Sequence, residues 1–198
     1  GGITFFQSDI LLDHALIGRN RTEDAINVIH GQFTFRDSEF STTFADAFDS
    51  DFSTGIISNC TFHDIAGDAV DVSGTSAVIY DTRMERIGDK GVSVGENSTV
   101  TIDGVSIDTV GIGVASKDLS RVTLSDSTIR KASFAALAAY IKKPVYGPAS
   151  IETTNVTILD TIKEAVAQTG STILLRGKPV QPVNLDVDLL YQQGILGN

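Results

Sequence analysis

The sequence predicts an all-β solenoid, a parallel β-helix of about eight rungs with roughly 22 residues in each. Three observations predict this fold. Similar short segments recur about every 22 residues, each copy carries an apolar residue at the same position, and no helical periodicity interrupts the pattern before residue 184. One copy is too short to bury its own apolar side chains, so neighbouring copies must stack to form a common core.

The first strand of each copy places a small residue directly before an apolar one. The small column consists of Ala25, Ala47, Ala69, Gly91, Gly113, Ala136 and Ala165. The apolar column consists of Ile26, Phe48, Val70, Val92, Val114, Leu137 and Val166. Because side chains alternate between the two faces of a strand, we expect the apolar column to form an interior ladder with a spacing of about 4.8 Å.

A second strand with alternating β-branched residues follows in each copy, and a turn with a short polar side chain comes after it. The turn column consists of Asp13, Asp37, Asn59, Asp81, Asp103, Asp126 and Asn155. Such side chains form hydrogen bonds with nearby backbone groups, so the column predicts a polar ladder along one corner. A third apolar position closes each copy, at Phe40, Phe62, Met84, Ile107, Ile129 and Ile158.

The two ends of the chain depart from this repeat. We expect residues 1–178 to form the β-helix and residues 179–198 to form a linker and a helix that caps the last rung. Pro179 and Pro182 break the strand pattern, and residues 184–191 have the pattern of a short amphipathic helix with Asn184 as N-cap and Gly194 as C-cap. The first rung has no visible cap, so we expect an upstream domain or a partner chain to cover it.

The composition argues against several classes of function. The chain has 198 residues, with 15 Lys and Arg against 25 Asp and Glu, and a formal net charge of −10. This acidic balance argues against nucleic-acid binding, which needs clustered basic residues. No run of 18 apolar residues is present, so we expect no membrane span. Cys60 is the only cysteine, which excludes an internal disulfide and a multi-cysteine metal site.

Over residues 1–178 the repeat resembles the right-handed parallel β-helix proteins of the pectate-lyase-like superfamily. Five runs of sequence are similar to the β-helix region near the C-terminus of large bacterial exported and cell-surface proteins, some of which carry CotH-type kinase-like domains: residues 23–27, 46–52, 67–71, 116–120 and 142–148. The resemblance implies an extracellular or cell-surface location. It also implies contact with long polysaccharides along one face, often by lyases, hydrolases or epimerases.

An acidic patch is the strongest candidate for a functional site. If the apolar column points inward, Asn27, Asp49, Asp71 and Ser93 point outward in one stack, and Asp51 projects from the same face. Three more carboxylates come at the preceding turn, at Asp24, Asp46 and Asp68. Stacked like charges raise one another's pKa unless a cation or basic groups neutralise them. Oxygen donors without nitrogen or sulfur favour Ca²⁺, which gives a candidate metal site at Asp46, Asp49, Asp51 and Asp71.

Two other interpretations of the acidic patch stay open. Asp49, Asp51 and Asp71 are candidate catalytic residues for acid–base chemistry on a sugar. However, the Gly-His-Gly motif of polygalacturonase-like hydrolases is absent from the sequence. Alternatively, the Asp side chains only cap turns and keep an exposed sheet soluble.

Basic and aromatic residues further along the chain are candidate ligand-binding groups. Lys90 replaces an Asp of the preceding rungs, and Lys117 lies beside Asp118. Both lysines either pair with the acidic rungs or bind an anionic sugar. The segment 140–148 lengthens one rung and supplies four more candidates, Tyr140, Lys142, Lys143 and Tyr146. These side chains either stack on sugar rings and bind carboxylates or sulfates, or belong to an ordinary surface loop.

Three functional hypotheses follow from these features. The first is an exported module that presents a polar face to a polysaccharide or another surface ligand, with or without Ca²⁺. The second is a polysaccharide lyase, hydrolase or epimerase that uses Asp49, Asp51 and Asp71. The third is an assembly subunit that docks through its uncapped N-terminal rung. The three histidines, His14, His30 and His63, fall in different columns and are interpreted as isolated surface or turn residues.

Overall fold

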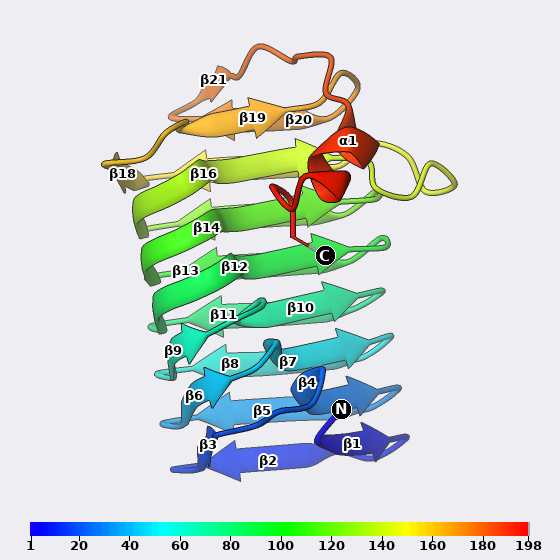
Figure 1. Cartoon of the computed structure of the whole chain (residues 1–198), viewed down its shortest axis with the longest axis vertical. Helices are drawn as coiled ribbons and strands as arrows, with labels where there is room; N and C mark the ends of the chain where they lie inside the picture. The colour runs from blue at the N-terminus through cyan, green and yellow to red at the C-terminus, as the bar shows by residue number, and fades with distance from the viewer. Residues whose placement is uncertain (198) are drawn as a thin grey trace.

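The chain folds into an all-β parallel β-helix of about eight rungs with one short helix near the C-terminus (Figure 1), which confirms the predicted fold class. The computed structural model describes residues 1–197. Strands one repeat apart in the sequence are parallel neighbours in space. Two parallel sheets run along the stack and enclose the core between them.

The larger sheet has two arms that join in the later rungs. Its long path contains β1 (Ile3–Phe6), β4 (Asp24–Ile29), β7 (Asp46–Asp51), β10 (Val70–Ser73), β12 (Arg83–Gly95), β14 (Ser106–Lys117), β16 (Thr128–Tyr140) and β18 (Thr157–Leu159). Its other members are β3 (Leu16–Gly18), β6 (Glu39–Thr43), β9 (Thr61–Ile65) and β19 (Ala165–Ala167). Strands β12, β14 and β16 each include both arms, because the chain bends without breaking there.

The second sheet forms the opposite wall. It contains β2 (Ile10–Asp13), β5 (Gln32–Arg36), β8 (Thr54–Ser58), β11 (Ser76–Tyr80), β13 (Thr99–Asp103), β15 (Arg121–Ser125), β17 (Ser150–Thr154), β20 (Thr172–Leu175) and β21 (Lys178–Pro179). All pairs in this sheet are parallel except that between β20 and β21, where the chain turns back on itself.

The predicted apolar column forms an interior ladder. Its members from Ile26 to Leu137 are paired in register and fully buried. Phe48 is the aromatic member of this ladder, with its ring centroid 4.8 Å from those of Phe33 and Phe35. A β-carbon on Gly55 would lie 2.3 Å from the ring of Phe33, so the glycine leaves the space that the ring fills. The core of the early rungs is therefore aromatic.

The last rung is shifted by one residue from the predicted register. Leu137 pairs with Ala165, whereas the sequence alignment placed Val166 opposite it. Val166 pairs with Ala138 instead. The rung before it contains the insertion at 140–148, and the chain re-enters the sheet with a different offset.

The polar turn ladder is also displaced by one residue in two rungs. Asp13 pairs with Arg36 and Asp103 pairs with Tyr80, so both end their strands. The turn position itself is held by residues with φ between 47° and 63°: His14, Asp37, Asn59, Asp81, Gly104, Asp126 and Asn155. Asn, Asp, His and Gly adopt this left-handed conformation most readily, which explains the composition of the column.

The C-terminal helix α1 (Val187–Gln192) lies beside the larger sheet rather than over the last rung (Figure 1). Its N-cap is Asp186, whose carboxylate accepts a hydrogen bond from the Leu189 amide at 3.0 Å, and not Asn184 as predicted. Val187 and Leu196 pack with residues of β14 and β16, including Ile112. The helix takes this place because alanines in β16 leave an apolar surface there. Strand β21 and the following residues cover the last rung instead.

The first rung is uncovered among residues 1–197. Strands β1, β2 and β3 each have a neighbour on one side only. Four apolar side chains of this rung are exposed: Ile3, Phe6, Leu11 and Leu16. A domain or partner at this end remains a prediction. No helix in the described part of the chain is long and apolar enough to cross a bilayer.

Candidate functional site

A cavity of about 830 Å³ lies on the larger sheet, where the third strand of one rung leads into the first strand of the next. We call it the corner cavity. Each rung from the second to the seventh contributes lining residues, many of them small, such as Ala66, Gly67, Gly88 and Gly111. The C-terminal tail after α1 forms part of the wall through Gly194, Ile195 and Gly197. The cavity therefore depends on the bend of each rung and on the folded-back tail.

The carboxylates of Asp46 and Asp68 hold consecutive rungs together at this bend. Asp46 Oδ1 accepts a hydrogen bond from the Asp68 amide at 2.7 Å, and Asp68 Oδ1 accepts one from the Lys90 amide at 2.8 Å. A β-carbon on Gly67 would lie 2.1 Å from Asp46 Oδ1, so only glycine allows the carboxylate this close approach. Both side chains thus have the turn-capping role that the sequence left open.

Asn27, Asp49, Asp71 and Ser93 form the predicted stack on the larger sheet. Asn27 Nδ2 donates a hydrogen bond to Asp49 Oδ2 at 2.6 Å. Burial and the nearby carboxylates of Asp71 and Asp51 raise the pKa of Asp49 to about 8. Asp49 therefore carries a proton at neutral pH.

Burial also acts on the two turn-capping carboxylates. It raises the pKa of Asp46 to about 6, although the hydrogen bond from the Asp68 amide opposes the shift. The pKa of Asp68 is raised well above its usual value by burial, with Lys90 acting in the opposite direction. The uncompensated desolvation of these carboxylates means that the site gains from any bound group that supplies positive charge or hydrogen-bond donors.

Lys90 lines the corner cavity, but its side chain is almost entirely buried and paired with carboxylates. Its ammonium group is 2.6 Å from Asp89 Oδ2 and 3.5 Å from Asp68 Oδ1, and its side chain is 3% exposed. Burial lowers the pKa of Lys90, but Asp68 and Asp89 more than compensate, so the net shift is upward. Of the two roles open for this lysine, the structure shows the pairing with acidic rungs.

Lys117 is buried in a similar way. Its Nζ lies 3.8 Å from Asp71 Oδ1, and its chain passes over Gly95, where a β-carbon would be 3.4 Å from Lys117 Cε. Burial lowers the pKa of Lys117, while Asp71 raises it, and the net shift is upward. The outward acidic stack is thus partly neutralised by a lysine from two rungs away.

The four candidate residues in segment 140–148 lie in different environments and do not form one binding surface. Tyr140 is the last residue of β16, is buried, and shares a hydrogen bond of 2.9 Å with the Tyr191 hydroxyl. Lys142 Nζ lies 4.5 Å above the Tyr191 ring and lines the corner cavity. Lys143 forms an ion pair with Glu96, and Tyr146 is half-buried in the turn. Lys142 is therefore the member of this group that a ligand in the cavity meets.

The predicted metal residues come together only in part. One carboxylate oxygen from each of Asp46, Asp68 and Asp71 lies within 4.8 Å of the others. Asp49 and Asp51 are not members of this cluster and do not line the corner cavity. Asp68 is a member of the cluster because the chain bends before the first strand of its rung, which turns the column of Asp46 and Asp68 toward Asp71. Strand alternation alone does not predict this bend.

Sequence reasoning missed Phe44 and Phe134, which both line the corner cavity. Phe44 is 73% exposed, whereas five of the ten phenylalanines of the chain are buried in the core. It occupies the position of Ala66 and Gly88 in the next two rungs, just after Thr43 and its partner Ile65. A large aromatic residue in a column of small ones was the signal that could have identified it.

Three buried polar atoms on the outward stack have no hydrogen-bond partner within residues 1–197: Asn27 Oδ1, Asp71 Oδ1 and Ser93 Oγ. Buried polar atoms are rarely left unsatisfied in native proteins. The stack therefore has capacity for additional partners beside the cavity.

The family described as right-handed β-helix region matches residues 14–172, which is most of the chain. The chain belongs to the right-handed β-helix family. This membership confirms the predicted resemblance to right-handed parallel β-helix proteins and agrees with the two parallel sheets of the structure. Comparison of this β-helix with curated protein sequences gives no match.

Among solved structures, the β-helix is similar to the catalytic domain of GH87 alpha-1,3-glucanase in complex with nigerose. The two chains share 10% sequence identity with a TM-score of 0.38, and the match covers 86% of this chain and 48% of that chain. A complex of that catalytic domain with tetrasaccharides gives 11% identity and a TM-score of 0.37 over 76% and 48%. QnrB1, a plasmid-mediated fluoroquinolone resistance protein, gives 12% identity and a TM-score of 0.22 over 99% and 97%. The β-helix spans about half the length of the glucanase chains, and likeness at this level carries no conclusion about function.

Proposed function

We propose that this right-handed β-helix is an exported, polysaccharide-binding module whose ligand occupies the corner cavity. The observation that carries the proposal is the exposed ring of Phe44 at a cavity lined by carboxylates and lysine side chains. Sugars present apolar ring faces, which stack on aromatic side chains, and hydroxyl groups, which bind carboxylates and ammonium groups. A volume of about 830 Å³ is in the range of small-ligand sites.

The charges of the corner cavity favour a neutral polysaccharide over an anionic one. Lys90 and Lys117 are already paired with carboxylates, which leaves Lys142 to contact the ligand. Five acidic residues line the cavity against three lysines: Glu23, Asp46, Asp68, Asp71 and Asp89. A uronic-acid or sulfated chain would meet net negative charge there.

The proposal includes one Ca²⁺ ion, with the carboxylates of Asp46, Asp68 and Asp71 as its ligands. The three carboxylates supply only oxygen donors, and Asp71 Oδ1 is buried without a hydrogen-bond partner among residues 1–197. This donor set fits Ca²⁺ better than a transition metal. Bound Ca²⁺ supplies a site for sugar hydroxyl groups, while Lys117 keeps Asp71 oriented.

A binding assay with two matched variants tests the proposal. Phe44→Ala removes the exposed ring of the cavity, and Phe52→Ala removes another exposed ring, which stacks on His30 outside the cavity. In affinity electrophoresis against a panel of neutral polysaccharides, we expect Phe44→Ala to lower the affinity at least tenfold and Phe52→Ala to leave it unchanged. Equal affinity of the two variants, or no retardation by any polysaccharide, would contradict the proposal.

One observation favours catalysis as a second candidate function. The pKa of Asp49 is raised to about 8 and Asp49 pairs in register with Asp71, and a pair of neighbouring carboxyl groups is what acid–base catalysis on a sugar uses. Binding is preferred because Asp49 does not line the corner cavity. Release of reducing ends from a polysaccharide that disappears in Asp49→Asn, and persists in Asp126→Asn at the turn ladder, would replace the binding proposal with a hydrolase.

The exposed apolar side chains of the first rung favour assembly as a further candidate. Leu11 and Leu16 are more than half exposed on strands β2 and β3, which are open on one edge. Edges of this kind pair with other chains unless they are covered. Sedimentation equilibrium should show association that Leu11→Lys with Leu16→Lys removes. A monomer at all concentrations would exclude self-assembly through this rung.

A further inference from the structure

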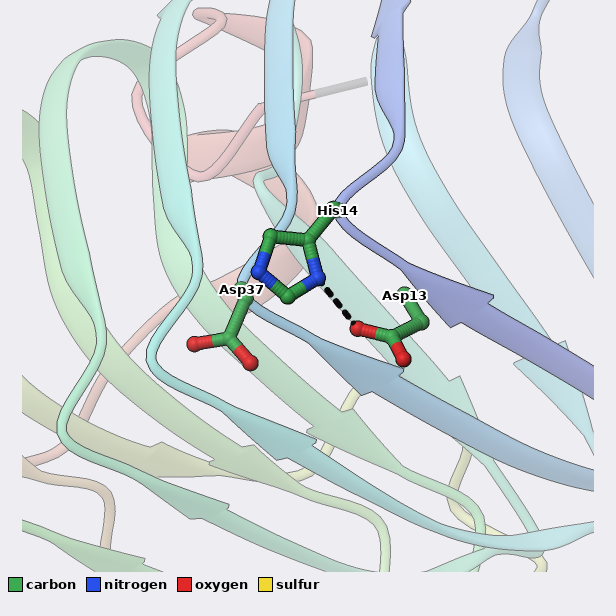
Figure 2. Close-up of side chains that lie close together, drawn as sticks. All are labelled: Asp13, His14 and Asp37. Atoms are coloured by element: carbon green, nitrogen blue, oxygen red, sulfur yellow. Dashed lines mark hydrogen bonds and ion pairs between the residues drawn. The ribbon is translucent and has the colours of Figure 1, made fainter.

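A second group of side chains lies at the turn after β2 and β5, away from the corner cavity. His14 and Asp37 occupy the same column of the turn ladder on adjacent rungs, with φ of 53° and 51°. Figure 2 shows the imidazole of His14 between the carboxylates of Asp13 and Asp37. His14 therefore does share a column with carboxylates, which the sequence alignment missed because it placed Asp13 in that column.

Asp13 fixes the orientation of the imidazole. Its Oδ1 lies 2.6 Å from His14 Nδ1, and its Oδ2 accepts a hydrogen bond from Arg36 Nη2 at 2.5 Å. With Nδ1 engaged by the Asp13 carboxylate, Nε2 is the imidazole nitrogen left for a metal ion. Within residues 1–197, Nε2 has no hydrogen-bond partner.

Asp37 is oriented from the other side. Its Oδ1 accepts a hydrogen bond from Asn59 Nδ2, one rung further along the ladder. One donor atom from each of Asp13, His14 and Asp37 lies within 4.8 Å of the others. His14, Asp37 and Asn59 line an open cleft of about 560 Å³, which gives solvent molecules and an ion access to Nε2.

We propose that His14 and Asp37 bind one divalent first-row transition ion of the Zn²⁺ class, through Nε2 of His14 and a carboxylate oxygen of Asp37. Asp13 acts as the carboxylate that orients the imidazole, an arrangement that accompanies most metal-binding histidines. Water completes the coordination. The imidazole nitrogen makes the site selective against Ca²⁺ and Mg²⁺, which take oxygen ligands.

The site is confined to the first two rungs by the composition of the ladder. From Asn59 onward the same position holds only Asn, Asp or Gly: Asn59, Asp81, Gly104, Asp126 and Asn155. These rungs offer no nitrogen base in the column, so they cannot repeat the donor set. They do provide a matched control, because Asp81 has the same backbone conformation as Asp37.

Equilibrium dialysis of the EDTA-treated protein against Zn²⁺, with millimolar Ca²⁺ and Mg²⁺ present, tests this site. We expect one Zn²⁺ per chain, a loss of at least tenfold in affinity for His14→Asn and Asp37→Asn, and no change for Asp81→Asn. Asn tolerates the left-handed conformation, so all three variants keep the turn. A circular dichroism melt of each variant confirms that it folds.

The visible spectrum of bound Co²⁺ gives a readout that a purely structural role would not affect. We expect bands of nitrogen-coordinated Co²⁺ that are absent from His14→Asn and weakened in Asp13→Asn, since loss of an orienting carboxylate lowers metal affinity roughly 10- to 100-fold. The proposal would be overturned if the protein retained no Zn²⁺ in the presence of Ca²⁺ and Mg²⁺. It would also be overturned if His14→Asn retained as much Zn²⁺ as the unmodified protein. Neither result depends on the corner cavity.

Discussion

The carboxylate of Asp68 binds the residue one rung further along the chain twice, because its Oδ1 lies 2.8 Å from the backbone amide of Lys90 and 3.5 Å from its ammonium group. The same ammonium group lies 2.6 Å from Asp89. The column of Asp46 and Asp68 thus changes to lysine at Lys90, and this lysine neutralises the acidic side chains in the middle of the stack. This pair determines how much of the corner cavity's charge remains for a ligand.

Replacement of Lys90 by Met should destabilise the fold strongly. The substitution leaves Asp68 and Asp89 without their cation in a buried site, and loss of one partner of a buried pair costs about 3–5 kcal/mol. Urea unfolding followed by circular dichroism measures the change. As a control, Arg83→Met removes an exposed pair with Glu85, which should cost less than about 1 kcal/mol. Equal losses in the two variants would show that Lys90 is not a buried charge partner.

Replacement of Asp49 by Asn should reduce the dependence of stability on pH. The folded-state pKa of Asp49 is about 8, and an unfolded Asp titrates near about 3.9. Between these values the folded state holds a proton that the unfolded state has lost, so stability decreases as pH rises from 4 to 8. Asn removes this contribution and still accepts a hydrogen bond from Asn27.

Urea unfolding at pH 5, 6, 7 and 8 measures that difference. Each linked proton contributes up to about 1.4 kcal/mol per pH unit, so the slope for Asp49→Asn should be shallower than for the unmodified protein. Asp126→Asn, at the exposed turn ladder, should keep the original slope. Identical slopes for all three proteins would show that Asp49 is ionised in the folded state at neutral pH.

Millimolar Ca²⁺ should raise the melting temperature of the protein, because an ion that binds only the folded state stabilises it by mass action. Asp71→Asn should remove most of this shift, since Asp71 supplies one of the three carboxylates and has an oxygen that is buried without a hydrogen-bond partner among residues 1–197. Asp81→Asn should leave the shift intact. A calcium titration that changes no melting temperature would restrict the cluster of Asp46, Asp68 and Asp71 to its structural role.

Two phenylalanines four residues apart should respond in opposite ways. Phe48 is fully buried between Phe33 and Phe35, so Phe48→Ala should cost about 3–5 kcal/mol of stability. Phe44 is exposed, so Phe44→Ala should change stability by less than about 0.5 kcal/mol. Thermal melting and urea unfolding distinguish the two. A large loss for Phe44→Ala would show that its ring packs against the protein and is not available to a sugar.

The sequence could predict the β-helix and its interior ladder because both depend on a local pattern that repeats. Ile26, Phe48 and Val70 recur at the same spacing, and strand alternation determines that they point inward. It could also identify the stack of Asn27, Asp49 and Asp71, since these residues follow the ladder directly. Periodicity contains this information whatever the final contacts are.

The corner cavity depended on tertiary structure. Asp68 joins Asp71 only because the chain bends between the third strand of one rung and the first strand of the next, and Lys117 reaches Asp71 only across Gly95. Helix α1 was foreseen as an element, but its place beside β14 and β16 followed from an apolar surface that exists only after the rungs have stacked.

The turn ladder shows the same division for His14. The sequence determined that short polar residues occupy the column, yet the column includes His14 and not Asp13, because the left-handed turn begins one residue later in the first rung. A shift of one residue therefore leaves Asp13 at the end of its strand and places His14 in the turn. The repeated pattern therefore determined the fold, whereas the bends and offsets between rungs, which depend on packing, decided which side chains meet.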